Sequence, residues 1–185
     1  NKQIELVAGS GQPGLQDGRG QNAQFQAPRG LTFDTNGLLF VVDASNHAIR
    51  RIDLSGNVTT VVGGKGKGMV DGPLREATLS APQLLAFNKK GVLYWTELGN
   101  KAIRRMQPGG PVETFTTTNG LDAKGNPVGK APLSIHDGFT IDAAGNIYFA
   151  ASGSQVIYKV DRQGQSTLIA GQRSISGLHV DGPLS

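Results

Sequence analysis

The chain contains no cysteine, few aromatic residues and no long apolar run, and the first and last of these absences exclude classes of protein. Without cysteine there can be no disulfide, no thiolate nucleophile and no zinc site built on thiolates. Aromatic residues make up only 6 % of the 185 residues. No apolar run approaches the roughly 18 residues that a membrane-spanning helix needs, so we expect no membrane span.

Glycine is abundant instead, with 27 residues, which is typical of many short strands joined by tight turns and not of helical bundles. One segment also occurs three times, at residues 30–63, 84–117 and 138–171, so that the copies are offset by 54 positions each time. A fixed period of this length is typical of repeat proteins, whose units depend on their neighbours for a core.

Each copy divides into four segments of strand length, which in the first copy are residues 31–33, 38–42, 48–52 and 58–62. Polar turns that close on glycine, such as Asn36-Gly37, join them. The second segment of each copy is a continuous apolar run, as expected of a strand covered on both faces. The sequence therefore predicts an all-β protein, a β-propeller of four-stranded antiparallel blades with about three blades present.

Charged residues recur at matching places in the repeats. The third strands carry Arg50-Arg51 and Arg104-Arg105, and we interpret these arginines as structural, with packed stems and heads that reach an edge. We expect Asp43 and Glu97 to cap the backbone of their loops, and Asp17 and Asp71 to form turns. The net charge is +4, and its scattered lysines, among them the pairs Lys65/Lys67 and Lys89/Lys90, are interpreted as a solvated surface.

The segments PRGLTFD (28–34), GLLFVVD (37–43) and NHAIRRI (46–52) together resemble the NHL-repeat family of β-propellers. The second copy keeps Asn100 but has Lys101 in place of the histidine. The resemblance implies a parent propeller of six blades. It implies little about activity, because NHL propellers serve as protein scaffolds, as RNA readers and occasionally as lyases.

The repeat pattern also predicts the domain organisation of a partial propeller within a larger protein. We expect residues 1–9 to form the outer strand of a preceding or closing blade. Three blades should follow at residues 28–63, 82–117 and 136–171, and residues 172–185 should begin a spacer to a further blade. If the chain truly ends there, its open blade faces should expose apolar surface and drive association.

A ligand site should lie at the propeller face where the loops between second and third strands meet the start of each innermost strand. A residue that serves the blade should repeat, whereas a residue that reads an asymmetric ligand should differ between blades. The candidate contact residues are Arg29, Gln83, His136, Asp137, Asn46, His47, Asn100 and Lys101.

No set of residues points to a catalytic centre, a metal or a cofactor. The three histidines, His47, His136 and His179, fall at three different positions of the repeat, so we expect no metal site. Ser134 with His136-Asp137 does not form a triad, since neighbours in a strand point to opposite sides. The run 63–68 (GGKGKG) lacks the serine or threonine ending of a phosphate-binding loop.

We therefore expect a non-enzymatic binding or scaffolding module, with a protein or small ligand at the propeller face and an extracellular or periplasmic location. Two alternatives stay open. One is a metal-dependent lyase or lactonase-like enzyme with a site completed by further blades, and the other is an RNA-binding propeller. RNA is the less expected partner, because the aromatic residues that would stack on bases lie in buried strands.

Overall fold

A computed structural model of the protein describes residues 3–121, 124–126, 129–130, 138–151 and 155–171. These residues form strands and turns, with two short 3-10 helices, η1 (Gly20–Asn22) and η2 (Ala44–Asn46). No helix among them is long and apolar enough to cross a membrane. The structure confirms the predicted all-β fold.

The strands form three sheets, one for each repeat. The first sheet has the order β1-β5-β4-β3-β2 and contains β1 (Gly18–Arg19), β2 (Pro28–Phe33), β3 (Leu39–Asp43), β4 (Ala48–Ile52) and β5 (Asn57–Gly63). The second has the order β10-β9-β8-β7-β6 and contains β6 (Pro82–Phe87), β7 (Leu93–Glu97), β8 (Ala102–Met106), β9 (Val112–Thr117) and β10 (Gly129–Lys130). The third contains β11 (Phe139–Ile141), β12 (Ile147–Ala151), β13 (Val156–Val160) and β14 (Ser166–Ala170) in sequence order.

The four main strands of each sheet are consecutive and antiparallel, as the repeat pattern predicts. Their first turn is held by one side-chain oxygen. Asp34 Oδ1 accepts hydrogen bonds from the backbone N–H of Asn36 at 2.9 Å and of Leu38 at 2.8 Å, and Gly37 closes the turn at φ +77°. This local chemistry fixes the register of the hairpin.

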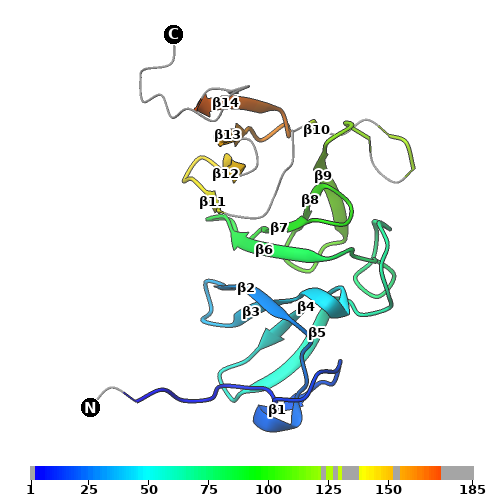
Figure 1. The fold of residues 1–185 in the computed structure, drawn as a ribbon, viewed down its shortest axis with the longest axis vertical. Helices are drawn as coiled ribbons and strands as arrows, with labels where there is room; N and C mark the ends of the chain where they lie inside the picture. The colour runs from blue at the N-terminus through cyan, green and yellow to red at the C-terminus, as the bar shows by residue number, and fades with distance from the viewer. Residues whose placement is uncertain (1–2, 122–123, 127–128, 131–137, 152–154, 172–185) are drawn as a thin grey trace.

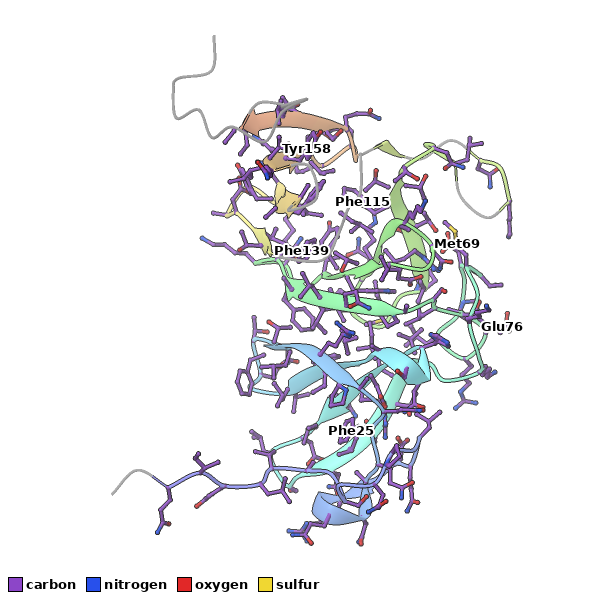
Figure 2. The ribbon with its side chains drawn as sticks, viewed as in Figure 1. Phe25, Met69, Glu76, Phe115, Phe139 and Tyr158 are labelled. Atoms are coloured by element: carbon purple, nitrogen blue, oxygen red, sulfur yellow. The ribbon has the colours of Figure 1, made fainter. Side chains whose placement is uncertain are left out.

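The three sheets stack on one another, and the innermost strand β6 contacts both β2 and β11 (Figure 1). Apolar side chains fill both interfaces. Phe40 and Phe87 meet edge to face at 5.0 Å between the first two sheets. Figure 2 shows Phe115, Phe139 and Tyr158 where the second and third sheets pack together. This is the stacking of propeller blades.

On the face of the first sheet that points away from the second sheet, the apolar side chains of β2 are exposed, whereas Val41, Ile52 and Val58 are buried beneath the segment that carries Ala23 and Phe25. Leu31 and Phe33 of β2 are 62 % and 63 % exposed, whereas their equivalents in the second sheet, Leu85 and Phe87, pack in the core against the first sheet. Among the described residues, 3–9 form no strand, and Ile4 in this segment is fully exposed.

The segments between the predicted blades, residues 10–27, 64–81 and 118–135, are spacers. Two short strands in them were not predicted from the repeat pattern. The two-residue strand β1 pairs with β5 antiparallel, and β10 pairs with β9 parallel, so that the first two sheets each gain a fifth strand at the outer edge. Strands this short leave no alternating pattern in the sequence. They tie each long spacer to the blade beside it.

Candidate functional site

A buried arginine organises the first sheet. Arg50 Nη1 donates to Asp43 Oδ2 at 2.7 Å, and Arg50 Nη2 donates to Asp17 Oδ1 at 2.8 Å. The side chains of Arg50 and Asp43 are completely buried, while that of Asp17 is about half exposed. The same guanidinium also donates to the backbone carbonyls of Gln24 and Gln16 in the spacer. It therefore fastens the spacer to the blade.

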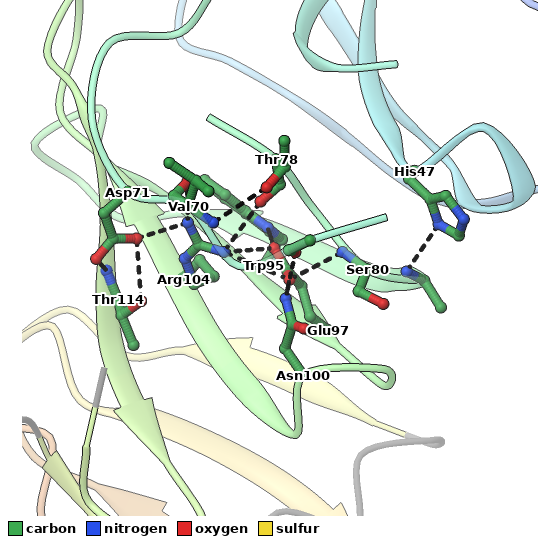
Figure 3. A network of polar contacts seen from close by, with 12 residues as sticks. His47, Val70, Asp71, Thr78, Ser80, Trp95, Glu97, Asn100, Arg104 and Thr114 are labelled. Carbon is green, nitrogen blue, oxygen red and sulfur yellow. Dashed lines mark hydrogen bonds and ion pairs between the residues drawn. The ribbon is translucent and has the colours of Figure 1, made fainter. Parts of the chain in front are cut away.

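The second sheet repeats this arrangement 54 residues later (Figure 3). Arg104 Nη2 donates to Asp71 Oδ1 at 2.5 Å, and Arg104 Nη1 lies 3.3 Å from Glu97 Oε1. Arg104 also donates to the carbonyls of Val70 and Thr78. Here too a buried arginine holds the spacer.

The carboxylates extend both networks. Asp71 accepts from the N–H of Thr114 at 2.8 Å and from its hydroxyl at 3.0 Å, and Asp17 binds Thr60 in the same way. Glu97 accepts from Trp95 Nε1 at 2.8 Å and from the backbone N–H of Ser80 at 3.1 Å. Each carboxylate thus joins segments that are distant in sequence.

These contacts correct three details of the sequence interpretation. The heads of Arg50 and Arg104 do not reach an edge but are buried in ion pairs. Asp17 and Asp71 serve as partners of these arginines and not only as turn residues. Asp43 and Glu97 cap backbone N–H groups of the preceding spacer, at Gln26 and Ser80, and not those of their own loops.

The third sheet has apolar residues at the described positions that correspond to this network. Its equivalents of the arginine, the buried carboxylate and the threonine are Tyr158, Ala151 and Leu168. Tyr158 and Ala151 are buried in the apolar core, and Leu168 packs against it. The charged clusters of the first two sheets are therefore alternatives to an apolar core, and we assign them a structural role.

Burial and hydrogen bonding shift the pKa values of two of these carboxyls in opposite directions. Burial raises the pKa of Glu97, although Arg104 and the donors from Trp95 and Ser80 favour its charged form. Burial also opposes ionisation of Asp17, but the hydrogen bonds from Thr60 and Arg50 together hold its pKa below the usual value.

Two predicted contact residues are engaged inside the blades. Asn46 Nδ2 donates to the carbonyl of Gly14 and to Asp43 Oδ2, each at 2.8 Å. Asn100 Nδ2 donates to the carbonyl of Gly68 at 2.8 Å and to Glu97. Their amides hold the loops between second and third strands.

His47 and Gln83 lie between blades. His47 adopts a left-handed backbone at φ 52°, and its Nδ1 accepts a hydrogen bond from the N–H of Ala81 in the next spacer, at 3.1 Å (Figure 3). Gln83 is buried, and its Nε2 donates to the carbonyls of Ala81 and Pro82. The His47 side chain therefore joins the first blade to the segment that leads into the second, whereas the Gln83 side chain holds the start of its own strand.

Arg29 and Lys101 are the exposed members of the predicted set. Arg29 lies in β2, which contacts η2, and Lys101 takes the left-handed position that His47 has in the first repeat. Neither side chain has a hydrogen bond or ion pair within the described part of the chain. His136 and Asp137 lie outside the described residues, so they are not placed.

A further group, which the sequence interpretation did not assign to a binding site, lines a cavity of about 350 Å³ between the turns of the second and third sheets. Lys89, Lys90, Arg105 and Arg162 surround it. Comparison of the turns between repeats could have found these residues. No group of three or more metal-ligating side chains occurs within residues 3–121 and the other described ranges.

Comparison with known proteins agrees with this geometry. The family model described as "Teneurin NHL domain" matches residues 7–75. NHL repeat-containing protein 2 of Bos taurus is 32 % identical over 97 residues, which cover 49 % of this chain and 13 % of that protein. The matches to curated relatives span 3 to 13 % of those relatives' own lengths.

Two solved structures share the fold. A streptogramin B lyase gives a TM-score of 0.58 at 17 % identity, with 83 % of this chain and 43 % of that chain covered. A nidogen/laminin complex gives a TM-score of 0.55 at 21 % identity, with 80 % and 50 % covered. With the three stacked four-stranded blades and the repeated Asn-x-Ala-Ile-Arg-Arg strands, these matches show a β-propeller fold and a similarity to NHL-repeat proteins.

Proposed function

We propose that this chain is a binding module whose partner, a protein or small ligand, contacts the face formed by the loops between second and third strands. The observation that carries the proposal is the fixing of these loops from inside. Asn46 and Asn100 bind the adjacent spacers, and the carboxylates beside them bind buried arginines. A loop held in this way presents its exposed side chains in one arrangement, which lowers the entropy lost on binding.

The exposed side chains on this face differ between the blades. Arg29 in the first blade corresponds to Gln83 in the second, and Lys101 in the second corresponds to His47 in the first. The two cations therefore do not follow the repeat. Their positive charge favours a partner with acidic groups, and the nidogen/laminin complex is a precedent for protein binding by this fold.

The test measures binding with a matched pair of variants. The unaltered protein is screened against an array of extracellular proteins, and the dissociation constant of each hit is measured by surface plasmon resonance. Arg29→Gln/Lys101→Gln should weaken true binding at least tenfold. Asn88→Asp/Gln107→Asp, which lowers the net charge by the same two units elsewhere, should leave it unchanged.

Two results would overturn the proposal. One is a set of hits that the Arg29→Gln/Lys101→Gln variant binds as tightly as the unaltered protein. The other is turnover of a lactone or a streptogramin, which would favour the enzymatic alternative. Preferential binding of single-stranded RNA would favour the third alternative.

We also propose that the exposed face of β2 associates with another apolar sheet face. Leu31 and Phe33 stand where the second blade uses Leu85 and Phe87 to contact its neighbour. Sedimentation velocity tests this directly. Phe33→Ser should shift any self-associated species to monomer, whereas a protein that is monomeric at all concentrations contradicts the proposal.

A further inference from the structure

We propose that the cavity between the second and third blades binds a small molecule that carries a phosphate or sulfate monoester. The cavity encloses about 350 Å³, which suits a ligand of monosaccharide size, and it lies among hairpin turns instead of at the loop face described above. The proposal therefore goes beyond the proposed function and uses different residues.

Four cations surround the cavity, and no carboxylate among the described residues lines it. Lys89 and Lys90 come from the turn between β6 and β7, Arg105 from β8, and Arg162 from the turn between β13 and β14. The side chains of Lys89, Lys90 and Arg162 have no hydrogen bond or ion pair within the described part of the chain. The two ammonium point charges and the two planar guanidinium groups together match a tetrahedral oxyanion.

The carboxylates nearby are engaged elsewhere. Glu113 accepts from Arg105 Nε at 2.9 Å, while Arg105 itself stacks over the ring of Phe115 at 5.1 Å. Asp142 and Asp161 lie in the turns of the third blade, where their oxygens accept hydrogen bonds from Asn146 and Gln163 of the same turns. None of these three lines the cavity.

The charges of the turns beside this cavity differ between the repeats. In the first blade the two turns on this side each begin with an aspartate, Asp34 and Asp53. In the second blade the equivalents are the neutral amides Asn88 and Gln107, and Lys89 and Lys90 follow the first of them. The second blade has thus lost both carboxylates of these turns and gained two cations.

The turn itself does not require this change. Asn88 Oδ1 accepts from the backbone N–H of Lys90 at 2.9 Å and of Val92 at 3.0 Å, which are the bonds that Asp34 makes in the first blade. An aspartate would cap the turn equally well. The neutral amide removes negative charge from the wall of the cavity without altering the backbone.

The floor of the cavity offers a donor. Tyr94 lines the cavity, and its ring is buried edge-on against Phe115 at 5.3 Å. Its hydroxyl has no hydrogen-bond partner within the described residues and is not among the buried unpaired atoms, so it meets solvent. A phenol hydroxyl among four cations can donate to an oxyanion oxygen.

The experiment titrates the purified protein with glucose 6-phosphate, glucose 6-sulfate and neutral glucose by calorimetry at low ionic strength. We expect at least one of the two esters to bind with a dissociation constant below 1 mM, and glucose not to bind. The ester that binds more tightly identifies the anion. Amide resonances of residues 89–91 and 143–145 should shift on binding.

Two variants of equal net charge separate the cavity from the overall charge of the protein. Asn88→Asp/Gln107→Asp keeps the cap of the turn and should weaken binding at least tenfold. Arg29→Gln/Lys101→Gln should leave binding unchanged. Equal weakening in both variants, or no binding of either ester, overturns the proposal. Since the protein-binding test depends on Arg29 and Lys101, either proposal can fail without the other.

Discussion

Replacement of Glu97 by alanine tests directly how much the buried ion pair of the second blade contributes to stability. It removes the completely buried partner of Arg104 and leaves the N–H groups of Trp95 and Ser80 without their acceptor. Removal of one member of a buried ion pair typically costs about 3–5 kcal/mol, because the other charge stays buried. Arg104 keeps Asp71 at 2.5 Å, so we expect the lower end of that range, about 3 kcal/mol.

The third blade indicates how this loss can be recovered. It carries Ala151 and Tyr158 at the positions of Glu97 and Arg104, and both are buried. Arg104→Tyr alone should also cost about 3 kcal/mol, because it leaves Glu97 without its cation. The double variant Glu97→Ala/Arg104→Tyr leaves no buried charge at these two positions. It should therefore cost at least 2 kcal/mol less than the sum of the single variants.

Urea unfolding measures all three variants. Trp95 is the only tryptophan and is completely buried, so its emission reports unfolding, and circular dichroism provides a check that does not depend on the indole. With a slope of about 1–3 kcal/mol per molar urea, a loss of 3 kcal/mol lowers the midpoint by about 1–3 M. If the costs of the two single variants simply add, the reasoning about the buried pair is wrong.

Three further predictions concern the backbone, a contact between blades and pH. Gly63 (φ +84°) should tolerate alanine much less than Gly37 (φ +77°). A Cβ at Gly63 would collide with the carbonyl oxygen of His47, whereas the atom nearest to a Cβ at Gly37 is 3.8 Å away. Thermal unfolding should show a loss of about 1–2 kcal/mol for Gly37→Ala and of more than twice that for Gly63→Ala. His47→Ala should cost about 1–3 kcal/mol by the same measurement, since the N–H of Ala81 loses its acceptor, and His47→Lys should not restore the loss. The free energy of unfolding should rise from pH 2 to pH 4, because hydrogen bonds lower the pKa of Asp53 and hold that of Asp142 at about 2, so the folded state binds fewer protons than the unfolded chain. The rise should level off above about pH 4.5, where the raised pKa of Glu97 acts in the opposite direction. Urea midpoints that fall from pH 2 to pH 4 would contradict this sign.

The fold was predictable because the turn residues and the strand lengths of one repeat recur at the same positions in the others. The polar turns at residues 34–37 and 88–91 close on glycine at matching places, and the strands between them have matching lengths. Hairpin turns of this kind are decided by neighbouring residues, which a sequence shows directly. The spacer strands β1 and β10 were not predictable, because two-residue strands arise from tertiary contacts.

The candidate site was less predictable, for a physical reason. The sequence places Arg50, Asp43 and Asp17 at repeating positions but does not show that they meet. Their meeting depends on how a long spacer folds back across the blade, which is a contact between residues more than 30 positions apart. The burial of the Arg50 head follows from that path, so the expectation that this head reaches an edge of the sheet was wrong.

A residue that differs between the repeats is a candidate for ligand binding, and a residue that repeats is a candidate for holding the blade. This distinction becomes useful only once the contacts of each residue are known. Asn46 and Asn100 repeat, and the structure shows both amides inside the blades. The network of buried charges also deviates in the third blade, yet there the arginine, the buried carboxylate and the threonine change together into the apolar residues Tyr158, Ala151 and Leu168. At residues 88 and 107 the change is different, because charge is altered on solvent-exposed turns whose backbone stays the same. No packing requirement explains that change, and the recognition of an anion does.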